Sequence, residues 1–346
     1  MLASITAVTA AVLLGILGDQ RGHRRRIASL AALSSMIGLL LMLVFPGKLS
    51  LVLCHGLLLP IASSLYGQLF ALARLVTPDR LTRDPVQAAL RSAMSLSFLA
   101  MLVVWTFGFA AQIDVMGIYV SAGMASFGLL ALIYLSWPRD GAPEWADQRS
   151  GLNFRQAFTE MAHPSILLRL LLLGAISASG ILYMILVSLV FDASPLRDAS
   201  DVALYVGLVA GWEVPCLLLL PRLVSRVRRS TLLAVGAGVY TLHLLAMPIL
   251  SDTPWIWAMT LLAGIGGTAL ISLPISYYQD LMHDRPGTAG AMLALQKLVS
   301  DVLGAAAFAI GTTVGGYETV AILGSVLALL GGAGLFWVDR HHAQPS

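Results

Sequence analysis

Charged residues are scarce in this chain of 346 residues: 11% are Asp, Glu, Lys or Arg, against roughly 25% in a soluble domain. So few charges cannot cover a water-facing surface of this size, which excludes an ordinary soluble fold. Cysteine is almost absent as well. Cys54 and Cys216 both lie inside apolar runs, so the sequence predicts neither a disulfide framework nor a metal site.

Sequence motifs of membrane enzymes and pumps are also lacking. The chain contains no H-E-x-x-H, no G-x-S-x-G and no P-loop. We therefore expect neither an enzyme nor an ATP-driven pump, and no catalytic residues. No cofactor, metal ion or nucleic acid is expected as a partner.

Long apolar runs are what the sequence has in abundance. A helix that crosses a bilayer needs roughly 20 mostly apolar residues. The runs are continuous, unlike the short alternating segments of a membrane barrel. The eleven predicted helices are 2–17, 27–45, 50–73, 88–111, 115–136, 164–191, 201–220, 230–250, 254–277, 288–311 and 317–338.

Arginine marks every second loop between these runs, beginning with Arg21, Arg24, Arg25 and Arg26 after the first one. The loops on the opposite side hold only Lys48 and Arg197. Because positive loops stay in the cytoplasm, the arginine-rich side is predicted to be cytoplasmic. An odd number of crossings then places the C-terminus in the cytoplasm.

A polar stretch divides the runs into two groups. The predicted organisation is an N-terminal bundle of five helices (1–137), a cytoplasmic linker (138–163), a C-terminal bundle of six helices (164–338) and a cytoplasmic tail (339–346). Arginine-rich loops recur six helices apart, as in two parallel repeats. The expected fold is therefore an all-α membrane protein with two pseudo-repeated bundles, and this arrangement resembles that of major facilitator transporters. Its twelve-helix template would lack the first helix here.

The first loop carries a recognisable motif, G-I-L-G-D-Q-R-G-H-R-R-R, over residues 15–26. It resembles the signature between the second and third helices of the major facilitator superfamily. The matching residues include Gly15, Asp19, Gly22, Arg24 and Arg25. A glycine permits a tight turn, and an aspartate is stabilised near a helix N-terminus. The resemblance implies a cytoplasmic latch between the two halves; the alternative is that the arginines only set the topology.

Four further stretches resemble the bacterial sugar efflux transporter (Set) family. They are Gln68–Arg74, Arg91, Gly211–Pro215 (G-W-E-V-P) and Tyr277–Met282 (Y-Y-Q-D-L-M). Because they occur in both halves and in register, the resemblance covers most of the chain. It implies a multi-pass protein of a bacterial inner membrane that exports sugars.

Ionisable side chains inside apolar runs are costly, so each is a functional candidate. Glu213 lies mid-run, where desolvation favours the neutral acid; it could carry a proton, or it could only support the helix backbone. Lys297 and Asp301 share a helix face and form either a local ion pair or a cavity-facing switch. Arg91 either takes part in gating or simply extends toward the headgroups.

Sugar recognition requires aromatic rings for stacking and amides for hydroxyl groups. The candidates for the substrate cavity are Gln68, Tyr183, Trp212, Tyr278 and Gln279. We expect a monomeric, proton-coupled secondary transporter in the lipid bilayer, exporting sugars or related small organic solutes by alternating access. The alternatives are a drug or metabolite exporter of the same superfamily, or a truncated membrane protein that transports nothing.

Overall fold

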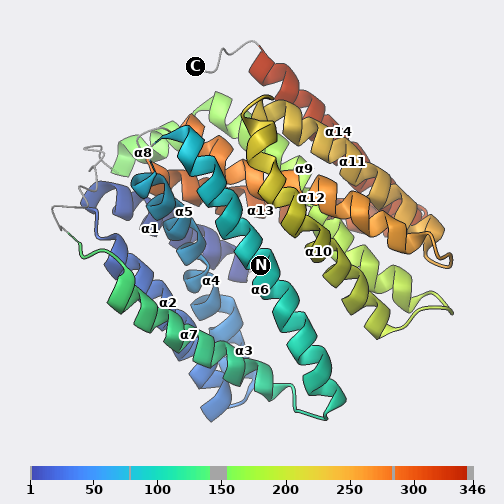
Figure 1. The fold of residues 1–346 in the computed structure, drawn as a ribbon, viewed down its shortest axis with the longest axis horizontal. Coiled ribbons are helices and arrows are strands. Elements are labelled where there is room, and N and C mark those ends of the chain that lie inside the picture. The colour runs from blue at the N-terminus through green and yellow to red at the C-terminus, as the bar shows by residue number, and fades with distance from the viewer. Residues whose placement is uncertain (1, 78, 141–153, 283–284, 341–346) are drawn as a thin grey trace. The chain divides into compact units, whose positions relative to one another are not determined.

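The computed structural model describes residues 2–77, 79–140, 154–282 and 285–340, which are helical and contain no strand (Figure 1). The helices are α1 (Leu2–Arg21), α2 (Arg24–Val44), α3 (Lys48–Leu53), the π-helical turn η1 (Cys54–Leu58), α4 (Leu59–Ala62), α5 (Ser64–Val76), α6 (Arg80–Ala110), α7 (Met116–Ser136), α8 (Phe154–Met161), α9 (Pro164–Asp192), α10 (Ala199–Val224), α11 (Arg229–Leu250), α12 (Ile256–Leu281), α13 (Pro286–Val314) and α14 (Gly316–Arg340).

Within these described residues, eleven helical segments are long and apolar enough to cross a membrane, with α3 to α5 forming one of them. The predicted all-α fold with eleven spans is therefore confirmed. Several helices continue beyond the predicted runs: α6 begins at Arg80 although the run begins at 88. Hydropathy marks only the part that fits the hydrocarbon core, whereas a helix can extend into the headgroup region.

The predicted helix 50–73 is interrupted in the structure. A π-helical turn, η1, precedes Pro60, and α5 begins only at Ser64. Proline has no N–H to donate and its ring crowds the preceding turn, so it distorts the helix in which it lies. The Ser34 hydroxyl of α2 donates to the Leu58 carbonyl at 2.8 Å, which satisfies a backbone group near the interruption.

The chain forms two compact units. Unit 1 comprises residues 1–78, 104–163 and 278–295, and unit 2 comprises 79–103, 164–277 and 296–346. Three helices are therefore divided between the units: α6 and α12 start in unit 2, and α13 starts in unit 1. The division into bundles at the predicted linker stays a prediction. Much of that linker (141–153) and most of the predicted tail (341–346) lie outside the described residues.

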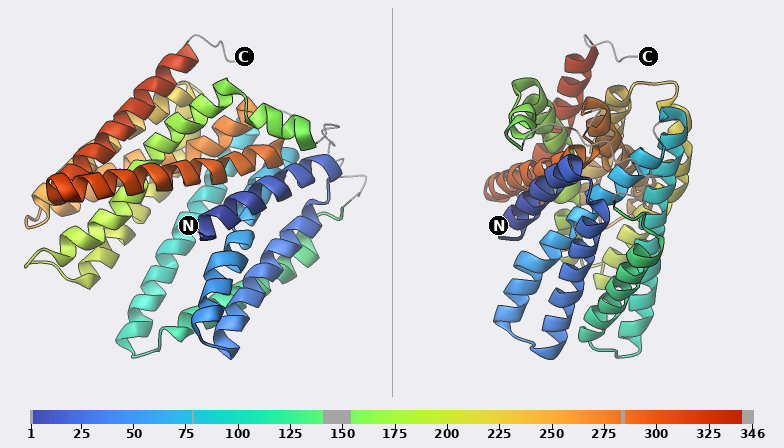
Figure 2. Two further views of the ribbon diagram at one scale, coloured as in Figure 1. Left: turned by 180° about the vertical axis from the view of Figure 1, so that it is seen from behind. Right: turned by 90° about the vertical axis from the view of Figure 1, so that its left-hand side faces the viewer.

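Closely packed helices form the interior of each unit. In unit 2, α14 lies beside α11 (Figure 1) and beside α9 (Figure 2). In unit 1, α2 packs along α7. Glycines allow the closest approaches in unit 2. A Cβ added at Gly266 of α12 would lie 2.8 Å from the Gly236 carbonyl oxygen of α11, and small residues are the usual means of close packing in membranes.

Replacing Gly266 with alanine should lower the stability of unit 2 by about 1–3 kcal/mol, the usual cost of overpacking. The added methyl would meet backbone atoms, which cannot rotate away. Thermal unfolding of the purified protein in detergent measures the loss. The matched control is Gly238→Ala on α11, where an added Cβ meets nothing within 4 Å. Equal unfolding temperatures for the two variants would contradict this packing argument.

The outward faces of the helices remain apolar. Phe107 of α6 is 70% exposed, and Met124 and Leu135 of α7 are 72% and 79% exposed. Large apolar surfaces of this kind are not left open to water in a soluble monomer. Lipid chains can cover them, and helices satisfy their own backbone hydrogen bonds within lipid. The chain is a multi-pass membrane protein.

Candidate functional site

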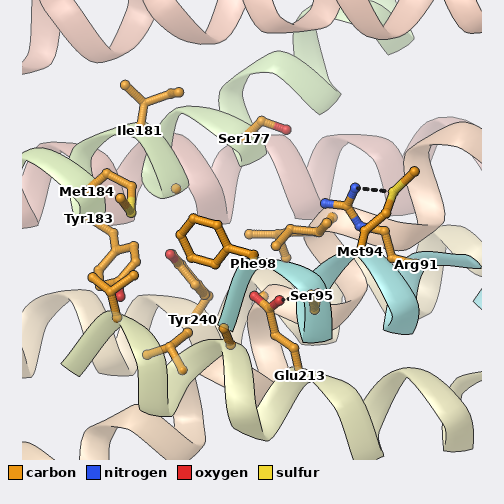
Figure 3. Close-up of a pocket in the computed structure, with 17 residues that line it drawn as sticks. Arg91, Met94, Ser95, Phe98, Ser177, Ile181, Tyr183, Met184, Glu213 and Tyr240 are labelled. Atoms are coloured by element: carbon orange, nitrogen blue, oxygen red, sulfur yellow. Dashed lines mark hydrogen bonds between the residues drawn. The ribbon is translucent and has the colours of Figure 1, made fainter. Parts of the chain in front are cut away.

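Unit 2 contains a cavity of about 480 Å³ between α6, α9, α10, α11 and α12. This volume is typical of a small-molecule site. Figure 3 shows side chains from these helices converging on it. The lining includes Arg91, Met94, Ser95 and Phe98 of α6, Ser177, Ile181, Tyr183 and Met184 of α9, Glu213 of α10, Tyr240 of α11, and Gly267, Leu270 and Ile271 of α12.

A buried carboxylate dominates one wall of this cavity. Glu213 is 9% exposed, and its Oε2 accepts a hydrogen bond from the Ser95 hydroxyl at 3.0 Å (Figure 3). Arg91 lies one turn before Ser95 on α6 and lines the same cavity. The cavity therefore presents a carboxylate and a guanidinium group to a bound solute.

The remaining wall is mainly apolar and aromatic. Phe98 and Met184 contribute apolar surface, and the Tyr183 ring meets the Tyr240 ring edge-on at a centroid distance of 6.2 Å. Tyr183 is buried, and its hydroxyl has no hydrogen-bond partner among the described residues. Such a wall fits a solute with an apolar body, and the unpaired hydroxyl can bond to a polar group of that solute.

The structure brings together three of the predicted cavity and coupling residues: Glu213, Arg91 and Tyr183. Trp212 is adjacent to Glu213 in sequence but is absent from this lining. It is 43% exposed and packs against Gly264 of α12. Successive helical residues point in different directions, so neighbours in sequence do not share a face.

Three other predicted cavity candidates, Gln68, Tyr278 and Gln279, lie in unit 1 and outside this cavity. Gln68 accepts from Arg24 Nη1 at 3.3 Å and donates to a backbone carbonyl. The Gln279 side chain donates to the Phe70 carbonyl at 3.0 Å, and Tyr278 is fully buried. In this conformation the two amides bond within the protein, and their role in binding a solute stays a prediction.

Lys297 and Asp301 form an ion pair within α13. Lys297 Nζ donates to both carboxylate oxygens, at 2.8 and 2.9 Å. The Lys297 side chain is 64% exposed, and neither residue is part of the cavity lining. This geometry is that of a local i,i+4 pair. A switching role for the pair stays a prediction.

The motif of the first loop is built around Asp19 in unit 1. Its Oδ1 accepts from the Gly287 N–H at 2.8 Å, and its Oδ2 accepts from the Thr288 N–H at 2.6 Å. Arg24 Nη2 lies 2.6 Å from Oδ1. Asp19 is 2% exposed, so it is a buried cap on the N-terminus of α13, where negative charge is stabilised.

The neighbouring motif residues explain why this contact can form. Gly22 has φ 71°, which a glycine adopts at no steric cost. A Cβ added at Gly15 would lie 2.5 Å from the Gly287 carbonyl oxygen, so α1 and α13 can approach only through glycines. The Arg25 N–H donates to Asp140 at 2.9 Å, which ties the start of α2 to the segment after α7.

Comparison with known families now decides what kind of protein this is. The family model described as Major Facilitator Superfamily matches residues 1–309. The chain belongs to the Major Facilitator Superfamily. The predicted family is confirmed, and this major facilitator is a membrane transporter by family and fold.

Two relatives of this major facilitator are sugar efflux proteins by name. It is 25% identical over 295 residues to "Sugar efflux transporter A" of Escherichia coli (strain K12), covering 80% of this chain and 69% of the relative. It is also 25% identical over 357 residues to a "Putative sugar efflux transporter" of Deinococcus radiodurans, covering 97% and 87%. The predicted resemblance to sugar efflux transporters is confirmed.

A solved structure supports the fold of this major facilitator. The human organic anion transporter MFSD10 (TETRAN) superposes with a TM-score of 0.75 at 16% identity. The match covers 96% of this chain and 82% of the human chain. At this identity the likeness shows the shared fold alone.

Sequence reasoning missed one buried ion pair in unit 2 of this major facilitator. Arg229, counted only among the loop arginines, is fully buried. Its Nη2 donates to both carboxylate oxygens of Asp84, at 2.7 and 2.9 Å. The pair joins the start of α6 to the start of α11. Loop arginines look alike in sequence, so only burial distinguishes this one.

Sequence reasoning also missed a network around Arg169 of α9. This residue is 5% exposed and pairs with Asp339 at 3.0 Å. The Tyr277 hydroxyl also donates to Asp339, at 2.8 Å. Asp339 falls within α14 rather than in a free tail. The three side chains come from α9, α12 and α14. The charges of Arg169 and Asp339 are therefore paired with each other inside the protein and not solvated by water.

Proposed function

We propose that this major facilitator is a secondary transporter that exports sugars or related small organic solutes in exchange for protons. The observation that carries the proposal is Glu213: an ionisable carboxylate on the wall of a solute-sized cavity inside a membrane-spanning helix. Ionisable groups in such positions typically mark substrate or proton pathways. The names of the two relatives support sugars as the class of solute and efflux as the direction of transport.

Proton exchange at Glu213 can be coupled to solute binding by competition. An ionised Glu213 attracts hydroxyl donors of a solute, and a protonated Glu213 attracts them less. A proton taken up from the outside therefore favours solute release there. When Glu213 loses that proton to the cytoplasm, the cavity regains its affinity for solute on that side. Each cycle exchanges one proton for one solute molecule.

Alternating access requires contacts that break as one side opens. We assign this role to the cap that Asp19 places on α13, together with Gly15, Gly22, Arg24 and Arg25. On this proposal the cap holds the cytoplasmic side closed and separates when that side opens. The proposal includes two moving bundles, 1–137 and 164–338, in a monomer with a cytoplasmic C-terminus in a bacterial inner membrane.

The lining of the cavity favours a second candidate, an exporter of amphipathic drugs or metabolites. Phe98, Met184 and Leu270 supply apolar surface, whereas the predicted amides Gln68 and Gln279 lie elsewhere. An amphipathic solute would place its apolar body against this wall and its polar end at Glu213. The two candidates differ in the solute that moves, and not in the coupling.

The purified protein in liposomes tests both candidates. Vesicles loaded with labelled sugars, alkyl or aryl derivatives of them, or amphipathic amines are diluted into acidic buffer. We expect faster efflux of at least one hydroxylated solute under the proton gradient, and no acceleration after a protonophore is added. Protein-free liposomes are the control. If only amphipathic amines move, the second candidate is correct; if the gradient changes no efflux rate, proton coupling is wrong.

A further inference from the structure

The serines of α6 do not all use their hydroxyl groups in the same way. Ser92 donates to the Ala88 carbonyl at 2.9 Å, and Ser97 donates to the Ala93 carbonyl at 2.7 Å. This bond to the carbonyl four residues earlier is the common behaviour of a serine within a helix. Ser95 instead reaches across to α10 and donates to Glu213 Oε2 at 3.0 Å.

Both members of this bond are shielded from solvent. Ser95 is 8% exposed and Glu213 is 9% exposed. In such surroundings a hydrogen bond to a charged acceptor is stronger than a bond between neutral groups. Ser95 is therefore a neutral donor placed directly on the group proposed to exchange a proton.

Few other side chains near Glu213 could act on its carboxylate in place of Ser95. The charged and titratable side chains that line the cavity beside Glu213 are Arg91 of α6, Tyr183 of α9 and Tyr240 of α11. Cys216 lies one turn along α10 itself.

From α12 the neighbour of Glu213 is a glycine. A Cβ added at Gly267 would lie 3.4 Å from Glu213 Oε1. This leaves one carboxylate oxygen beside open space in the cavity, while Ser95 holds the other oxygen.

We infer that Ser95 is a positioning residue for proton exchange: its hydroxyl holds the ionised Glu213 carboxylate by Oε2 and leaves Oε1 turned toward the cavity. The inference rests on the proposed function of Glu213 as the proton carrier. A donor to a carboxylate stabilises the charged form. Without the donor, the ionised Glu213 carboxylate loses this stabilisation and is no longer held in place by Oε2.

The test compares the pH dependence of gradient-driven efflux from liposomes for wild type, Ser95→Ala, Ser95→Cys and Ser95→Thr. Loss of the donor should move the pH of half-maximal efflux upward by about one unit, a tenfold change in proton affinity. Ser95→Cys, which has nearly the same size but a weak donor, should move in the same direction. Ser95→Thr keeps the hydroxyl and should retain the wild-type midpoint.

Ser92→Ala is the matched control, because it removes a buried α6 hydroxyl that bonds only to its own helix. Thermal unfolding of each variant verifies that it is folded. The inference is overturned if Ser95→Ala keeps the wild-type midpoint while Glu213→Gln loses gradient-driven efflux. If Glu213→Gln keeps that efflux, the proton-carrier role fails, and the inference about Ser95 fails with it.

Discussion

Replacing Glu213 with glutamine should reduce proton-driven efflux by this major facilitator to the rate seen without a gradient. Glutamine has nearly the shape of glutamate and can still accept the bond from Ser95, but it cannot carry a proton. Exchange of labelled for unlabelled solute at equal pH on both sides should continue. Liposome efflux with and without an imposed pH gradient measures both rates.

A second carboxylate provides the control for this experiment. Glu318 lies in the first turn of α14 and outside the lining of the 480 Å³ cavity. Glu318→Gln should therefore retain gradient-driven efflux. Full retention by Glu213→Gln would remove Glu213 from the coupling mechanism, whatever solute is carried.

Replacing Asp19 with alanine should lower the free energy of unfolding by about 3–5 kcal/mol, the usual cost of removing one partner from a buried ion pair. The change removes the carboxylate that Arg24, which is 3% exposed, contacts at 2.6 Å. It also removes the acceptor for the Gly287 and Thr288 N–H groups. Thermal unfolding in detergent measures the loss.

Removing both charges tests how much of that loss comes from the buried charge of Arg24. Asp19→Ala combined with Arg24→Leu should recover part of the stability, since the buried arginine charge is then removed together with the carboxylate that it contacts. Hydrogen exchange should show faster opening of the first turn of α13 in both variants, because the cap is absent in each. A double variant as unstable as Asp19→Ala would contradict the assigned cause.

Asp198 is the matched control for the cap. It is the N-cap of α10 and accepts from the Ser200 and Asp201 N–H groups, but it is exposed. The hydrogen bond from the Ser200 hydroxyl is the largest cause that lowers the pKa of Asp198, and the two backbone hydrogen bonds lower it as well. Its contribution to stability is therefore fully present above the usual pKa of an aspartate. That contribution is lost as the pH falls from there through the lowered pKa of Asp198. Asp198→Ala should cost much less than Asp19→Ala, because water can replace the lost partner.

The membrane spans were predictable because hydropathy is a property of each run by itself. The eleven runs needed no knowledge of which helices touch. The sequence shows Pro60 within the predicted helix 50–73, but the π-helical turn that precedes this proline was not predicted. The division of α6, α12 and α13 between the two units was also missed, since it depends on contacts far apart in the chain.

The candidate site was predictable only where a residue type is unusual in its setting. Glu213 stood out as a charge in an apolar run, and Asp19 as part of a motif. Ser95 did not stand out, because serines are common in such helices and most bond to their own backbone. Arg229 was hidden among other loop arginines, although its side chain is completely buried.

The sequence alone determined that this chain crosses the membrane, how many apolar segments it offers and which superfamily it resembles. Transfer of a side chain from water to lipid depends on that side chain and its near neighbours, so it can be read along the chain. Only the tertiary structure decided which polar groups are partners: Asp19 with the start of α13, Ser95 with Glu213, and Asp84 with Arg229. A hydrogen bond acts over about 3 Å, so its partner is set by the helix that packs opposite.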